Sequence, residues 1–332
     1  MTHRRLALAV ALAITTADVS AQRQPAPFHS GVEIVYLDLT VTGPDGSIVT
    51  GLTKDDFEIF DEGVRHEVAV FSDKPEPISL GILVDASISM TGDRIMAAIN
   101  AADEMGRALE PTDVWSVFAF NSRLTPVIGW RFYDPSVVKE LQKLGVGPRT
   151  ELFKSVAEMV PKFRDAPHRK RALLVITDGA DISLVAAGRP PQVSQSVDQQ
   201  GPPSLDVNAY AGMFGGSRDY TGDAVNALRT GEVLVYGLGM GWPQEDGTIS
   251  DLHVPSLEKL AHPTGGGVAV ARTMAALPIL AKRLTDTLRQ QYTVGFTPLK
   301  EPDGKYRLVK IVAKNPSYTV RTRAGYLAAK KR

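Results

Sequence analysis

Residues 79–89 read Ser-Leu-Gly-Ile-Leu-Val-Asp-Ala-Ser-Ile-Ser, a continuous apolar run that ends on Asp85 and two spaced serines. Runs of this kind are typical of strands buried on both faces of a parallel sheet. The pattern recurs at 173–176 and 233–236, and segments with helical spacing lie between the runs. Strands that alternate with helices predict an α/β fold, a doubly wound and mostly parallel sheet with flanking helices.

The spacing of apolar residues predicts the other elements of this region. Helices are expected directly after residue 89, with Asp93 capping the first turn, and at 135–144, 152–163, 256–261 and 275–290. Further strands are expected at 113–121, 124–130 and 268–271. Together these elements place an α/β domain at residues 78–290.

Both ends of the chain have the period-two alternation of β-strands, interrupted by turns that contain Asp-Gly or Pro. The strands expected are 32–37, 47–49, 57–60 and 67–71 near the start, and 292–296, 306–313 and 318–323 near the end. We therefore expect residues 22–77 and 291–332 to pack together as one small antiparallel β unit beside the α/β domain.

The stretch 185–219 is rich in Gln, Ser, Pro and Gly and has little apolar periodicity. It is too long for an ordinary connection between a strand and a helix. The composition favours a flexible loop, with a role as a lid or partner contact as the alternative.

Composition excludes several classes of protein. The chain has 332 residues, no cysteine, and 37 basic against 37 acidic side chains. Disulfides, thiolate zinc sites and thiol nucleophiles are therefore excluded. The sequence also has no cluster of basic residues of the kind that binds nucleic acid.

The first residues have the form of a secretory signal. A basic head, His3-Arg4-Arg5, precedes an apolar run at 6–15 and a small-residue exit that ends at Ala21. We expect residues 1–21 to be a cleaved signal peptide and the protein to be exported, either periplasmic or secreted. No later stretch reaches the ~18 consecutive apolar residues of a membrane helix, so no membrane span is expected.

Oxygen-bearing side chains follow the predicted strands at one edge of the sheet. Asp85, Ser87 and Ser89 follow the first strand, Thr150 precedes a helix, and Asp178 follows the strand at 173–176. Ligands of open α/β sheets bind at the carboxyl ends of the strands. An oxygen-only set suits a hard cation, Mg²⁺ first, with Mn²⁺ or Ca²⁺ as alternatives.

Mg²⁺ dehydrates reluctantly, which suggests how these residues would share it. Ser87, Ser89 and Thr150 would bind directly, Asp85 and Asp178 would hold its waters, and a sixth position would stay open. Each part of this residue set also has an explanation that involves no metal, because Thr150 is a plausible helix N-cap and Asp178 a turn residue at the end of a strand. Their common position at one edge favours the metal site.

Asp85-x-Ser87-x-Ser89, Thr150 and Thr177-Asp178-Gly179 resemble the metal-ion-dependent adhesion site (MIDAS) of von Willebrand factor A (VWFA) domains. The resemblance covers residues 78–290. The flanking segments 52–59, 68–71, 292–298 and 323–326 are similar to the exported bacterial VWFA-related proteins. The resemblance implies a protein-binding, adhesion-type module in which an Asp or Glu of a protein partner completes the metal shell.

One part of the motif departs from the family. Pro148-Arg149-Thr150 stands where the family commonly has Gly-Gly-Thr. The charge of Arg149 favours an acidic partner and weakens metal affinity in the free protein, while Asp181 could offset it. We therefore assign Arg149 and Asp181 to partner binding.

An enzyme needs a nucleophile or a base that the sequence does not identify. Ser87 lacks the G-x-S-x-G elbow and stands where a haloacid-dehalogenase-type phosphatase has its second aspartate. The glycines at 237, 239 and 241 lack the dinucleotide fingerprint and are expected to ease the exit of a strand. We expect no enzyme. A Mg²⁺-dependent hydrolase and a structural assembly module that does not use the metal are the alternatives.

Overall fold

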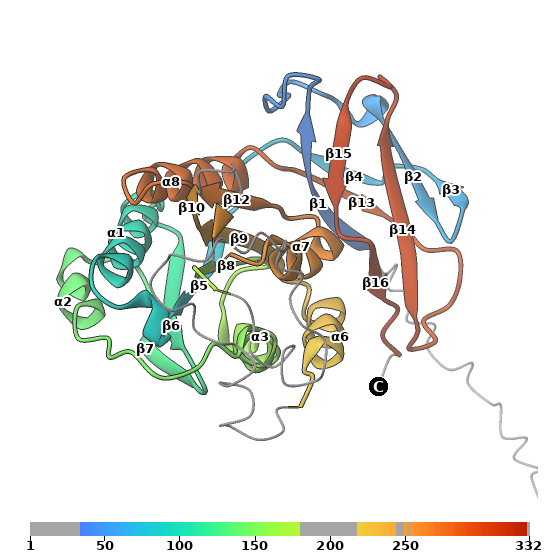
Figure 1. Cartoon of the computed structure of the whole chain (residues 1–332). Helices are drawn as coiled ribbons and strands as arrows, with labels where there is room; N and C mark the ends of the chain where they lie inside the picture. The colour runs from blue at the N-terminus through green and yellow to red at the C-terminus, as the bar shows by residue number, and fades with distance from the viewer. Residues whose placement is uncertain (1–33, 180–217, 244–248, 251, 331–332) are drawn as a thin grey trace, which may run out of the picture. The chain divides into compact units, whose positions relative to one another are not determined.

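The centre of the α/β region is a six-stranded sheet in the order β12-β9-β8-β5-β6-β7 (Figure 1). The structure, a computed structural model, describes residues 34–179, 218–243, 249–250 and 252–330. Strand β7 runs antiparallel to β6, and the other neighbours are parallel. The strands are β5 (Ile78–Asp85), β6 (Val114–Phe120), β7 (Leu124–Arg131), β8 (Lys170–Thr177), β9 (Leu234–Met240) and β12 (Val268–Ala271).

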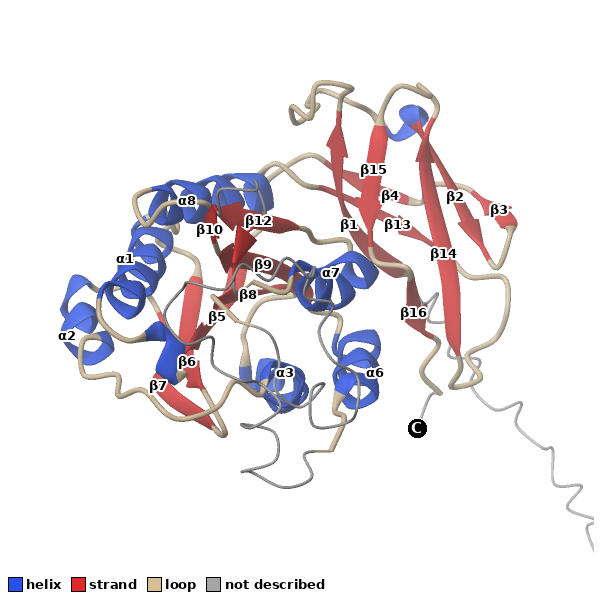
Figure 2. Cartoon of the chain, viewed as in Figure 1, coloured by secondary structure: helices blue, strands red, loops and turns tan. Residues whose placement is uncertain are grey.

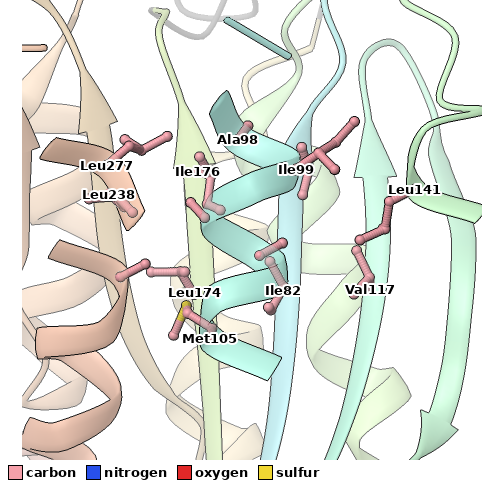
Figure 3. Close-up of a cluster of buried hydrophobic side chains, with 14 of the residues drawn as sticks. Ile82, Ala98, Ile99, Met105, Val117, Leu141, Leu174, Ile176, Leu238 and Leu277 are labelled. Atoms are coloured by element: carbon pink, nitrogen blue, oxygen red, sulfur yellow. The ribbon is translucent and has the colours of Figure 1, made fainter. Parts of the chain in front are cut away.

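Helices cover both faces of this sheet, as the colouring in Figure 2 makes clear. The helices are α1 (Asp93–Arg107), α2 (Val138–Leu141), α3 (Leu152–Met159), α6 (Thr221–Gly231), α7 (Val254–Ala261) and α8 (Ala276–Arg289). Helices α1, α2 and α8 bury their apolar sides on one face, and α3, α6 and α7 bury theirs on the other. In Figure 3, Ile82 and Leu174 of the sheet lie beside Ile99 and Met105 of α1. The predicted doubly wound, mostly parallel sheet is confirmed.

The strand order identifies where a ligand would bind. Numbered along the chain within the sheet, the order is 3-2-1-4-5-6 read from β7 to β12, and the connections reverse direction between β5 and β8. Ligands of doubly wound sheets bind outside the carboxyl ends of the strands at this switch point. Asp85 ends β5 and Thr177 ends β8, so the motif residues lie at that point.

The strands from the two ends of the chain pair with one another. Two four-stranded antiparallel sheets, β15-β1-β13-β4 and β16-β14-β2-β3, enclose a third apolar core. These strands are β1 (Val35–Thr42), β2 (Phe57–Asp61), β3 (Val64–His66), β4 (Val70–Ser72), β13 (Tyr292–Phe296), β14 (Tyr306–Ala313), β15 (Thr319–Thr322) and β16 (Gly325–Leu327). A short ribbon joins β10 (Trp242–Pro243) to β11 (Ile249–Ser250). Glu33–Arg332 form one compact unit, and the exact domain boundaries stay a prediction.

Two predicted helices are shorter than expected. The helix at 152–163 ends at Met159 and continues as a 3-10 segment, Val160–Asp165. Pro161 has no N–H, so it cannot donate the next α-helical hydrogen bond. In the range 135–144 only the four residues of α2 are α-helical, after the 3-10 turn Pro135–Val137.

Other sequence predictions need correction at the ends of elements. Gly92 caps α1, and Asp93 is the first residue of the helix. Of the predicted strand 67–71 only residues 70 and 71 are in a strand, β4, which pairs with β13, whereas β3 ends at His66 and pairs with β2. The run 47–49 makes a single bridge, Ile48 with Thr42. Helix α6 and strand β16 are absent from the predictions, because their sequences have few regularly spaced apolar residues.

The glycines at 237 and 239 do not mark the exit of a strand. Both lie inside β9, where the backbone approaches its neighbours closely. A Cβ at Gly237 would lie 3.0 Å from Leu257 Cβ in α7, and one at Gly239 would lie 2.6 Å from Leu252 Cδ2. The absence of a side chain at these two glycines therefore lets Leu257 and Leu252 pack directly on β9.

Arg169 connects the β unit to the start of β8. Its Nη2 lies 2.9 Å from Asp38 Oδ1 and 2.8 Å from Glu76 Oε2. Burial acts to raise the pKa of Asp38, but the hydrogen bond and charge of Arg169 outweigh burial and hold that pKa below its usual value. A lowered folded-state pKa stabilises the protein above the unfolded-state pKa, about 4, and this stabilisation is lost as pH falls through the folded-state value.

Asp38→Asn is therefore expected to lower the free energy of unfolding at pH 7 by about 1 kcal/mol, a value reduced for partial exposure of the pair. The free energy of unfolding should also fall less steeply between pH 5 and pH 3 in the variant than in the wild type. Urea denaturation across this range measures both effects. Asp55→Asn, at an exposed carboxylate, is the matched control, and an identical acid dependence in the two variants would contradict the role of Asp38.

Some sequence predictions lie outside the described residues. These are the signal peptide at 1–21, Asp181, and the loop at 185–219 up to residue 217. Among the helices that the structure describes, none is long and apolar enough to span a membrane.

Candidate metal centre

Asp85 lies at the base of the candidate site. It is the last residue of β5 and is fully buried. Its Oδ1 accepts a hydrogen bond from the Ser87 backbone N–H at 2.9 Å, and its Oδ2 accepts one from Thr177 Oγ1 at 2.5 Å. These two hydrogen bonds fix the carboxylate between the ends of β5 and β8.

Hydroxyls connect the two carboxylates of the motif. Ser87 Oγ lies 2.9 Å from Ser89 Oγ, and Ser89 Oγ donates to Asp178 Oδ1 at 2.8 Å. Ser87 and Asp178 are buried, whereas Ser89 is exposed. Four sequence-predicted ligands, Asp85, Ser87, Ser89 and Asp178, thus form one hydrogen-bonded cluster that opens to solvent at Ser89.

Thr150 comes to the same edge on a separate loop. Gly147 N–H donates to the Ala86 carbonyl at 2.7 Å, which ties this loop to the one that carries Ser87. A methyl group built on Gly179 would lie 3.7 Å from Thr150 Oγ1 and 4.0 Å from Ser89 Oγ. Thr150 is therefore beside the cluster, and Gly179 leaves the space between them open.

Burial changes the protonation of Asp85. Desolvation raises the pKa of this carboxyl to about 7, and the nearby charge of Asp178 acts in the same direction. The hydrogen bonds from Thr177 and Ser87 oppose the rise. Two carboxylates in one buried cluster are costly without a cation, which is the electrostatic environment of a cation site.

Arg94 supplies one positive charge to this cluster. Its Nη1 lies 2.5 Å from Asp178 Oδ2 and donates to the Ser89 carbonyl at 3.2 Å. The Arg94 side chain is 23% exposed and that of Asp178 1%. Arg94 thus holds one oxygen of Asp178, while Oδ1 faces Ser89.

Arg149 is paired within its own loop. Its Nη1 lies 3.6 Å from Glu151 Oε1, and Glu151 also accepts from Lys154 Nζ at 2.8 Å. Glu151 is thus one partner of Arg149, whereas Asp181, the residue expected to offset its charge, lies outside the described residues.

The five predicted residues have the chemistry of a hard-cation site. Their donors are hydroxyl and carboxylate oxygens, the class that Mg²⁺, Mn²⁺ and Ca²⁺ prefer. No cluster of three or more His, Asp or Glu side chains suited to a metal occurs among the described residues. The hydroxyls are therefore indispensable to this candidate.

Sequence reasoning missed Arg94 and Glu151. Acidic residues are favoured in the first turn of a helix, where the helix dipole is positive. A basic residue in the first turn of α1 departs from this preference. That departure was the available signal that Arg94 has an acidic partner outside its helix.

The fold and the motif define a VWFA-like domain: a doubly wound sheet with the Asp-x-Ser-x-Ser loop at its switch point. Solved structures similar to the chain include such domains. No protein family model matches the sequence, and no curated protein matches it.

Three solved structures illustrate the similarity. Von Willebrand factor type A from Catenulispora acidiphila is 14% identical, with a TM-score of 0.47 over 92% of this chain and 78% of that one. The vWF domain of the type V pili tip protein Mfa5 from Porphyromonas gingivalis is 10% identical, with a TM-score of 0.45 over 64% and 97%. Proximal thread matrix protein 1 from the mussel byssus, with a zinc-occupied MIDAS motif, is 10% identical, with a TM-score of 0.41 over 69% and 49%.

Proposed function

We propose that this protein is a metal-dependent, adhesion-type binding module. Asp85, Ser87, Ser89, Thr150 and Asp178 hold a divalent cation, Mg²⁺ first, with Mn²⁺ or Ca²⁺ as alternatives. The cation binds a carboxylate of an Asp or Glu on a protein partner. The observation that carries the proposal is the hydrogen-bonded cluster of Asp85, Ser87, Ser89 and Asp178 at the switch point of the sheet.

Binding fits this site better than catalysis does. A general base must have an oxygen or nitrogen within reach of the proton that it removes. Asp85 already accepts from Ser87 and Thr177, and Asp178 accepts from Ser89 and Arg94. Both carboxylates are also buried, so neither is accessible to a proton on a substrate, and we propose that the protein is not an enzyme.

The exposed side of the site suits an acidic partner. Ser89 opens to solvent, and Arg149 lies on the neighbouring loop with 19% of its side chain exposed. A cation beside a metal attracts a carboxylate and repels other cations. We assign Arg149 to the partner-binding rim.

We also propose that the protein acts after export, in the periplasm or outside the cell. The support is the basic head, apolar run and small-residue exit of residues 1–21. The mass of the protein recovered from its native host would show cleavage after Ala21, and an uncleaved chain would contradict export by this signal.

Isothermal titration of the chelator-treated protein with Mg²⁺, Mn²⁺ and Ca²⁺ tests the metal site. We expect saturable binding of at least one cation. Ser89→Ala should weaken it about tenfold, because one neutral oxygen ligand is lost from an exposed position. Ser136→Ala, at an exposed serine on the segment before α2, should bind as the wild type does.

The partner step needs a second measurement. Beads that carry a Gly-Gly-Asp-Gly-Gly peptide should retain the protein with metal and release it with chelator, whereas an Asn-containing peptide should not retain it. Metal binding without this retention would contradict carboxylate recognition alone. The absence of saturable binding for all three cations would contradict the metal site itself.

A further inference from the structure

A cavity lies at the far end of the central sheet from the candidate metal centre. Its volume is about 280 Å³, and its wall includes Arg171 at the start of β8 and Leu234 at the start of β9. The metal-site residues follow the opposite, carboxyl ends of the sheet strands. The rest of the wall comes from β1, α6, α7 and the 3-10 turn His262–Thr264, strands β14 and β16, and residues next to these elements.

The wall of this cavity carries an excess of positive charge. Its acidic members are Asp38 and Glu232, whereas its basic members are Arg169, Arg171, Arg229, Lys259 and Arg323. Arg169 pairs with Asp38, and Arg323 pairs with Glu232. Within the described ranges, Arg171, Arg229 and Lys259 have no ion pair with a carboxylate.

The guanidinium groups in the wall have unused hydrogen-bond donors. The Nε atoms of Arg171 and Arg323 are buried and have no acceptor among the described residues. A buried donor without an acceptor costs free energy, and the cost is larger on a charged group. An anion in the cavity would balance the excess positive charge of the wall and so lower this cost, although these two Nε atoms themselves lie beneath the cavity surface.

One cation of the wall is held in place without an anion. The guanidinium of Arg229 lies over the Tyr306 ring, 5.3 Å from its centroid. This cation–π contact restricts the side chain while leaving its N–H groups available for hydrogen bonding. Tyr36 and Tyr326 add aromatic surface to the same wall.

We propose that this cavity is a binding site for a small oxyanion, a ligand that carries a phosphate or carboxylate group. Planar guanidinium groups match both kinds of group with paired N–H donors. The volume suits a small molecule and is near the lower end of known ligand pockets. The proposal does not depend on the metal site, because the two sites share no residue.

Titration of the purified protein with inorganic phosphate, pyrophosphate and citrate, followed by calorimetry in a chloride buffer, tests the proposal. We expect saturable binding of at least one anion, and the ranking distinguishes phosphate from carboxylate ligands. Arg171→Gln should weaken binding about tenfold or more, because it removes a half-buried, charged donor. Lys259→Gln, at an exposed position where folding is not at risk, should weaken binding several-fold.

Two variants serve as controls for these measurements. Arg164→Gln removes an exposed cation that does not line the cavity and should leave anion binding unchanged. Asp85→Ala alters the metal site and should also leave it unchanged, which separates failure of one site from failure of the other. The proposal is overturned if none of the three anions binds saturably, or if Arg171→Gln and Lys259→Gln both bind as tightly as wild type.

Discussion

Asp85→Ala is expected to abolish divalent-cation binding, with a loss of affinity of about 100-fold or more. Asp85 is fully buried at the base of the cluster, and its two oxygens orient Ser87 and Thr177. Its removal takes away one of the two carboxylates of the proposed site together with the anchor of the Ser87 loop. Calorimetric titration of the chelator-treated variant with Mg²⁺ and Mn²⁺ measures the loss.

The fold should survive this substitution. The variant loses two hydrogen bonds, at a cost of about 1–3 kcal/mol each, but it also loses a buried carboxylate that is costly without a cation. We expect the free energy of unfolding without metal to change by no more than about 2 kcal/mol, because the two effects have opposite signs.

Asp85→Asn and Thr177→Ala are the matched controls. Asn keeps the size and an acceptor for the Ser87 N–H but removes the charge, so it should also lose most of the metal affinity. Thr177→Ala removes a donor to Asp85 that is not itself a proposed ligand, so it should weaken metal binding by less than Asp85→Ala does. Wild-type affinity in Asp85→Ala would show that the cation, if it binds, binds elsewhere.

Arg94→Gln is expected to tighten metal binding about tenfold and to destabilise the metal-free protein by about 1–2 kcal/mol. Arg94 is the cation that balances Asp178 in the structure, and Asp178 is 1% exposed. Without Arg94 the metal-free site holds a buried carboxylate without its counter-charge. A bound divalent cation supplies that charge, so the metal-bound state loses less stability than the metal-free state.

Thermodynamic linkage requires these two effects to agree. A substitution that destabilises the metal-free state more than the metal-bound state must strengthen metal binding. The gain in binding free energy equals the difference between the two losses of stability. Removing the guanidinium also removes its repulsion of the incoming metal. Urea denaturation in chelator and in saturating Mg²⁺, together with calorimetric titration, measures the whole cycle.

Arg94→Lys is the control that keeps the charge. We expect its metal affinity to stay close to that of the wild type, with a modest loss of stability because lysine cannot contact both Asp178 and the Ser89 carbonyl in the same way. Weaker metal binding in Arg94→Gln would contradict competition between Arg94 and the metal. It would show instead that Arg94 aligns Asp178 as a ligand.

The local pattern of the sequence determined the fold class. The apolar run at 79–84 is long enough to be buried on both faces, and all of β5 is buried in the structure. Burial on both faces is a property of the strand's own residues, so it can be read from sequence. Glycine positions such as 237 and 239 could not be interpreted correctly, because their role depends on leucines from another segment.

The sequence also identified the kinds of oxygen in the candidate site. Asp85, Ser87 and Ser89 are neighbours in the chain, and a strand end places them at one edge. Asp178 lies 89 residues after Ser89 in the chain and accepts a hydrogen bond from it. This contact is possible because β5 and β8 pair in parallel. The strand pattern predicted that shared edge, and the tertiary structure gave the distances.

The charges around the site were decided by tertiary structure alone. Arg94 reaches Asp178 across 84 residues of chain, and Arg171, Arg229 and Lys259 line one cavity from β8, α6 and α7. Long cationic side chains carry no spacing rule that predicts their partners, because their reach is set by the packing of whole elements. Short side chains on a strand end are fixed by the backbone, and for this reason the sequence determined the candidate ligands while only the folded chain determined their counter-charges.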